Sequence, residues 1–152
     1  MKRVIYGILI AGAMAIPTRP LELGKLKPVE VVRIDKRGEQ IMIETDLGDS
    51  GSGKTVAEAI LDLKERTPGT VYLDTAEYAL IPWDETVLAQ IAPYLQEKVR
   101  ICHWEGEMEL ERVAEYLDVH RPNVKLKDYH TGSLIQTLEW KKDSFYLCEK
   151  ST

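Results

Sequence analysis

A glycine-rich stretch holds the residues best suited to chemistry. The eight residues from Gly48 to Thr55, reading Gly-Asp-Ser-Gly-Ser-Gly-Lys-Thr, match the phosphate-binding P-loop pattern at every position. In such a loop, glycines let backbone N–H groups surround phosphates, a lysine reaches the outer phosphates and a threonine hydroxyl holds Mg²⁺. Asp74 would supply the aspartate on the metal side. One hypothesis is therefore a minimal protein that binds Mg-ATP or Mg-GTP, with these site residues: Gly48, Gly51, Gly53, Lys54, Thr55 and Asp74.

Three features favour a different interpretation of the same stretch. The preceding segment 40–47 alternates between apolar and mostly polar residues, whereas a P-loop strand is apolar nearly throughout. Thr55-Val56-Ala57-Glu58 is a capping box, which commits the Thr55 hydroxyl to its own helix backbone. The chain after Asp74 shows no base-recognition motif and no arginine finger. We therefore expect residues 49–53 to be a connecting loop, with no catalytic residues and no cofactor or metal.

The periodicity of apolar residues predicts strands and helices in alternation. Strands are expected at 29–35, 40–47, 70–73, 78–81, 99–103, 124–126, 135–140 and 145–148, with 78–81 resuming or extending 70–73. Helices are expected at 56–66, after the cap Asp84 with a kink at Pro93, and at 107–117. The resulting order is β-β-α-β-α-β-α-β-β-β. It indicates a single α/β domain of α+β character, with three helices and a mixed sheet that is parallel across the helical crossovers.

The N-terminus differs in character from the rest of the chain. Lys2 and Arg3 precede an apolar run that ends at Ile16, which is typical of a secretory leader. We divide the chain into a leader at 1–16, a linker or extended arm at 17–28 and one domain at 29–150. The alternative is a cytoplasmic protein in which the apolar run is a buried strand. Cys102 and Cys148 could pair in an exported protein, or remain free as small apolar residues.

Composition limits the range of functions. Of 152 residues, 44% are hydrophobic and 30% charged, as in an ordinary globular protein, and the formal net charge of −5 gives no reason to expect nucleic-acid binding. Four alternating glutamates from Glu105 to Glu111 could form a cation site or a solvated face that complements a helix dipole. Trp83, Trp104 and Trp140 lie near element ends, and an exposed pair of them would indicate a partner surface.

Parts of the chain resemble a known family. The segments Val32-Arg33-Ile34-Asp35 and Gly53-Lys54-Thr55-Val56-Ala57-Glu58-Ala59-Ile60, followed by the strand at 71–81, are similar to the N-terminal region of the Ger(x)C family of spore germination lipoproteins. The resemblance covers residues 29–117. It implies a glycine loop followed by a helix cap, an exported protein and no catalytic residues. The chain departs from the family in lacking a cysteine after the leader and in being less than half as long.

These observations lead to one functional expectation and its alternative. We expect a non-catalytic binding or accessory domain, exported or associated with the cell envelope and related to sporulation or germination. Its partner would be a protein or a membrane surface, not nucleic acid, and the sequence does not identify whether a small-molecule ligand is bound. The alternative is the nucleotide-binding protein described above.

Overall fold

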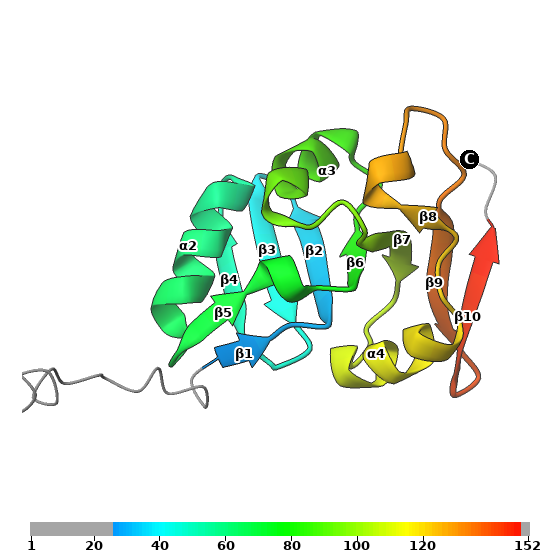
Figure 1. Cartoon of the computed structure of the whole chain (residues 1–152), viewed down its shortest axis with the longest axis horizontal. Coiled ribbons are helices and arrows are strands. Elements are labelled where there is room, and N and C mark those ends of the chain that lie inside the picture. Colours follow the sequence, from blue (N-terminus) through cyan, green and yellow to red (C-terminus); the bar gives the residue numbers. More distant parts are fainter. Residues whose placement is uncertain (1–25, 150–152) are drawn as a thin grey trace, which may run out of the picture.

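Strands with alternating apolar side chains form an eight-stranded mixed sheet in the computed structural model, which describes residues 26–149 (Figure 1). The strand order is β10-β9-β7-β6-β2-β3-β4, and β8 pairs with β7 beside this path. The bounds are β2 (Val31–Arg37), β3 (Gln40–Thr45), β4 (Ser50–Gly53), β6 (Tyr78–Ile81), β7 (Arg100–Glu105), β8 (Val124–Lys125), β9 (Gln136–Lys141) and β10 (Ser144–Glu149). The predicted mixed sheet in one α/β domain with three helices is confirmed.

The middle of the sheet is parallel and its two ends are antiparallel. Strands β2, β6, β7 and β9 run in the same direction. The hairpin partners β3 and β4 extend one end, and β10 extends the other. A two-residue turn joins β9 to β10, with positive φ at Lys142 and Asp143, as a type I′ turn requires. Strand β1 (Leu26–Pro28) pairs in parallel with β5 (Thr70–Tyr72) in a separate small sheet.

Two helices cover one face of the large sheet. The apolar stripe of α2 (Val56–Arg66) faces inward through Val56, Ala59, Ile60 and Leu63. It packs with α3 (Glu85–Ile91) over Ile34 and Ile43 and their neighbours in one buried cluster. Pro93 ends α3 in a short 3-10 turn over Ala92–Tyr94, as the predicted kink anticipated.

A single helix covers the opposite face, and only in part. The buried side of α4 (Leu110–Val119) packs on the start of β2 and on β6, β7 and β9, through Val31, Tyr78, Leu80, Cys102 and Leu138. No residue of β3 or β4 belongs to this cluster. Of the helices described, none therefore covers this face of β3 and β4, or of β2 beyond Val31.

The structure corrects four expectations from sequence. Residues 50–53 form strand β4 rather than a loop, because they pair with β3 along their length. Strands β5 and β6 are separate, since a 3-10 turn at Leu73–Thr75 sends them into different sheets. Helix α4 begins at Leu110, three residues late, because Glu109 is the N-cap and its backbone is still extended. Part of the predicted linker, 26–28, is strand β1.

Some predicted segments lie outside the described residues, namely the leader at 1–16, most of the arm at 17–28 and the end of the domain at 150. Among residues 26–149, none of the helices has the length and hydropathy needed to cross a membrane.

Candidate functional site

The glycines of the P-loop-like stretch serve the contact between β4 and α2. A Cβ atom on Gly51 would lie 2.3 Å from the Ala59 carbonyl oxygen and 2.3 Å from the Leu63 backbone nitrogen. One on Gly53 would lie 2.5 Å from the Glu58 Cβ. Both distances are far below van der Waals contact, so only glycine permits this approach of strand to helix. Gly48 has a different role, because it turns the chain between β3 and β4 with a φ of 80°.

Thr55 is the N-cap of α2, as its capping box predicts. Its hydroxyl accepts a hydrogen bond from the Glu58 N–H at 3.2 Å, and the Glu58 carboxylate accepts from the Lys54 N–H at 2.8 Å. These bonds satisfy backbone donors that the start of a helix leaves open. The Thr55 hydroxyl is therefore engaged with the helix backbone in this arrangement.

Backbone donors near the stretch do not converge on one point. The Ser52 N–H donates to Asp62 at 2.8 Å, and together with Arg66 this bond holds the pKa of the Asp62 carboxyl below its usual value. Asp74 is distant from Lys54. It follows β5 in the 3-10 turn where the Thr75 hydroxyl accepts from the Val29 N–H, two residues before β2, whereas Gly53 is level with Lys36 near the end of β2. The structure thus brings Lys54 and Thr55 together but leaves Asp74 at the opposite end of the sheet.

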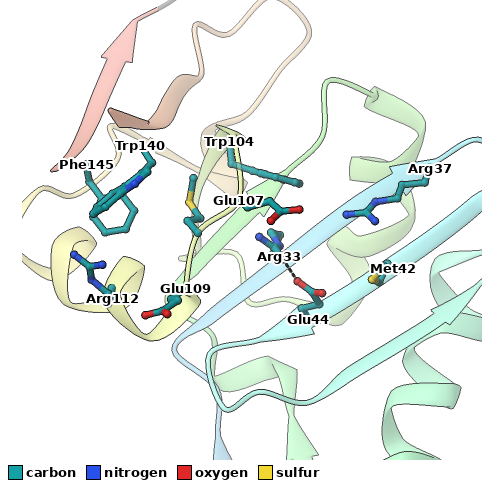
Figure 2. Close-up of a pocket in the computed structure, with 11 residues that line it drawn as sticks. Arg33, Arg37, Met42, Glu44, Trp104, Glu107, Glu109, Arg112, Trp140 and Phe145 are labelled. Atoms are coloured by element: carbon teal, nitrogen blue, oxygen red, sulfur yellow. Dashed lines mark hydrogen bonds and ion pairs between the residues drawn. The ribbon is translucent and has the colours of Figure 1, made fainter. Parts of the chain in front are cut away.

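The largest cavity described lies on the other side of the same strands. It has a volume of about 570 Å³ and opens between the uncovered face of β2 and β3, the loop before α4, and the β9–β10 hairpin (Figure 2). Its lining contains arginine, glutamate, methionine and aromatic side chains, and no histidine, cysteine, serine or lysine: Arg33, Arg37, Met42, Glu44, Trp104, Glu107, Met108, Glu109, Arg112, Trp140 and Phe145. We call this cavity the groove.

Half-buried aromatic rings form one wall of the groove. Trp140 and Phe145 are directly opposite each other on β9 and β10, with ring centroids 4.6 Å apart. The Arg112 guanidinium of α4 lies 4.6 Å from the Trp140 ring, and the Arg33 guanidinium lies 4.9 Å from the Trp104 ring. Both arginines are thus held against indole faces, a favourable cation–π arrangement.

Charges on the floor of the groove largely neutralise one another. Arg33 and Glu44 are cross-strand neighbours on β2 and β3 and form an ion pair. Arg37 is paired with Asp35 at 2.7 Å, and this contact raises the pKa of the Arg37 guanidinium. Among residues 26–149, no ion pair joins Arg112, Glu107 or Glu109 to an opposite charge.

A second hollow of about 350 Å³ continues the groove past the loop that enters α4. The two hollows share Arg33, Glu44, Met108 and Glu109. The second adds further acids and small polar residues from the β3–β4 turn and the start of α4, including Asp46, Asp49, Ser50 and Glu111. We call the two hollows together the trough. It is lined by six carboxylates and three guanidinium groups, so its formal charge is −3.

A smaller pocket of about 260 Å³ lies on the α3 side, at the carboxyl ends of β6 and β7. His103 in its wall is 7% exposed, donates from Nδ1 to the Ile81 carbonyl at 3.1 Å and stacks on Trp83 at 3.6 Å. Burial lowers the pKa of His103, which keeps the ring neutral near pH 7. No cluster of three or more potential metal ligands occurs in the part of the chain that the structure describes.

Sequence reasoning anticipated some components of the groove but not their assembly. Trp104 and Trp140 do come together, whereas Trp83 lies on the other side of the sheet. Two of the four alternating glutamates, Glu107 and Glu109, line the groove. The arginines were missed, although the alternation of Arg33, Asp35 and Arg37 marks a polar strand face. Both cysteines are free, and Cys102 is buried.

Comparison of the chain with known families, with curated proteins and with solved structures gives no significant match.

Proposed function

We propose that the protein is a non-catalytic binding domain that holds a segment of a partner protein in the groove. The observation that carries this proposal is the uncovered face of β2 and β3, bordered by three half-buried aromatic residues, in a cavity of about 570 Å³. Aromatic residues and arginine are enriched where proteins bind partners, and they contribute most of the binding energy there. The ion pairs Arg33–Glu44 and Arg37–Asp35 hold the floor in a preformed shape, which lowers the cost of binding.

The lining also favours binding over covalent chemistry. It offers no imidazole base and no serine, cysteine or lysine nucleophile, and of its three glutamates Glu44 is already paired with Arg33. The glycine-rich stretch is accounted for by the contact between β4 and α2, so it does not require a phosphate ligand.

The three tryptophans provide an internal test. Twelve-residue peptides would be selected from a random library on the immobilised protein and added to ¹⁵N-labelled protein. We expect the indole N–H signals of Trp104 and Trp140 to shift and that of Trp83, outside the groove, to remain in place. Selected peptides that shift only Trp83, or no indole signal, would contradict the proposal.

We further propose that this domain acts at the cell envelope of a spore-forming bacterium, as an accessory protein in sporulation or germination. The support is the charged and then apolar order of residues 1–16 and the resemblance to the Ger(x)C family described above. N-terminal sequencing of the protein from its native host tests the location. Protein that is soluble in the cytoplasm and retains Met1 would contradict it.

A further inference from the structure

We propose that the segment bound in the trough is basic, an extended stretch rich in lysine or arginine; this inference rests on the proposed binding function. The first reason is net charge. The trough carries −3, and two of its three arginines already have carboxylate partners, Glu44 for Arg33 and Asp35 for Arg37. A ligand therefore meets mainly carboxylates, and electrostatic complementarity selects a cationic partner.

The position of the acids strengthens this reason. Glu107 and Glu109 border the groove on the loop before α4, and neither forms an ion pair within residues 26–149. Figure 2 shows the Glu107 carboxylate between Trp104 and Arg33, and the Glu109 carboxylate below Arg112. A lysine or arginine entering the groove can thus pair with these two carboxylates, which favours cations over neutral polar groups.

Two guanidinium groups of the protein itself lie against tryptophan rings in the groove. Arg33 and Arg112 come from a strand and a helix, and each places its guanidinium within 5 Å of a tryptophan ring centroid. The same lining disfavours the other large classes of partner. Nucleic acid and anionic membrane surfaces both present negative charge, which a trough of charge −3 repels.

The first experiment compares two labelled peptides of twelve residues by fluorescence anisotropy with the full-length protein. In one, lysine alternates with serine; in the other, glutamate replaces every lysine. We expect the lysine peptide alone to bind, with an affinity that falls as NaCl is raised from about 50 to 500 mM, because salt screens exposed charges. Equal binding of both peptides, stronger binding of the glutamate peptide, or no binding of the lysine peptide would overturn the inference.

A matched pair of variants separates the trough from the overall charge of the protein. The double variant Glu107→Gln/Glu109→Gln removes two acids of the groove, and we expect it to weaken lysine-peptide binding about tenfold. Glu65→Gln/Glu97→Gln changes the net charge equally at two exposed positions outside both hollows, and its affinity should stay within about twofold. Equal weakening by both pairs would mean general attraction and would overturn the inference.

The library peptides of the previous section distinguish failure of this inference from failure of the binding function. Selected peptides that are neutral or acidic, yet shift the Trp104 and Trp140 signals, would overturn the basic partner and leave the groove as a binding site. Basic peptides that shift both signals, with shifts lost in Glu107→Gln/Glu109→Gln, would support both proposals.

Discussion

The strands β2, β3 and β4 present two faces of opposite character. On one face, Ile34, Ile43 and Gly51 lie under α2, and the glycine lets the helix backbone approach the strand directly. On the other face, Arg33 and Glu44 border a groove that α4 lines with Arg112 and that none of the described helices covers. Because side chains alternate along a strand, neighbouring residues of the same short segment serve either packing or recognition.

This difference explains why the most conspicuous motif of the sequence does not mark the groove. Gly51 and Gly53 of the P-loop-like stretch let β4 approach α2 on the covered face of the sheet, which we call the closed face. The opposite face, which carries the groove and which we call the open face, is built from residues far apart in the sequence. Arg33, Trp104 and Trp140 are examples, and only the strand order brings them together. A contiguous motif is easy to recognise, whereas a surface assembled by topology is not.

We expect the largest loss of stability when the contact between β4 and α2 is forced apart. Gly51→Ala places a methyl group 2.3 Å from backbone atoms of α2, which cannot move aside as a flexible side chain would. We expect a loss of about 3 kcal/mol in the free energy of unfolding, measured with urea. Ser50→Ala, the neighbouring residue on the open side, should change it by less than about 0.5 kcal/mol. Similar losses for the two variants would mean that the faces do not differ.

Breaking the ion pair of the open face should have a smaller effect. Glu44→Ala leaves the Arg33 guanidinium, whose side chain is 14% exposed, without its carboxylate. We expect a loss of about 2 kcal/mol, below the roughly 3–5 kcal/mol of a fully buried pair. The double variant Arg33→Leu/Glu44→Leu should recover most of this loss, because no uncompensated charge remains. A double variant as unstable as Glu44→Ala would show that the pair itself, rather than the stranded charge, matters.

Loss of the N-cap of α2, on the closed face, should have a smaller effect on stability. Thr55→Ala removes the acceptor for the Glu58 N–H, and we expect it to destabilise the protein by about 1 kcal/mol. Thermal or urea unfolding provides the measurement. Thr55→Ser keeps a hydroxyl and serves as the control, with stability close to that of the unchanged protein. If Thr55→Ala costs nothing, the capping role is wrong.

A fall in pH should destabilise the protein through His103, which lies on the α3 side of the sheet. His103 is neutral in the folded protein because burial lowers its pKa, so its ring must gain a proton when the chain unfolds in acid. The contribution is present above the ordinary pKa of about 6.5 and is lost as the pH falls below it. We expect the free energy of unfolding to fall between pH 7 and pH 5. His103→Gln should flatten this dependence, and an equally steep fall in that variant would contradict the prediction.

The smallest effect is expected at Lys54. Its side chain is exposed, and its backbone N–H is already bound to Glu58. Lys54→Ala should therefore change the free energy of unfolding by less than about 0.5 kcal/mol. Mg-ATP and Mg-GTP should produce no binding heat in calorimetry. Heat that disappears in Lys54→Ala would restore the nucleotide-binding hypothesis.

Local sequence signals predicted the elements that local interactions determine. The helix at 56–66 and the strand at 78–81 have the predicted bounds, because apolar periodicity, the capping box and the proline-glycine stop all agree. Strand β4 was missed because serine and glycine have low strand propensity, and only its pairing with β3 makes it extended. Glycine at every second position was the available signal of a close contact on one face.

The groove could be predicted only in part, for a different reason. The alternation in β2 and β3 indicated a polar face, and Trp104 and Trp140 were noted near strand ends. Their meeting depends on β7 and β9 being neighbours and on α4 crossing to the face opposite α3, and no local pattern specifies either. Arg112 was overlooked because its importance comes from Trp140, a partner 28 residues away.

The outer edge of the sheet at β10 has one further consequence. This strand is six residues long, contains no proline and pairs only with β9 among the described strands. Both outer strands carry a helix contact on their backbone, since the Ser52 N–H of β4 donates to Asp62 of α2 and the Leu147 backbone of β10 is hydrogen-bonded to the Tyr116 hydroxyl of α4. A further strand added beside β10 would therefore have to displace the Tyr116 hydroxyl, although the ladder between β9 and β10 would stay intact.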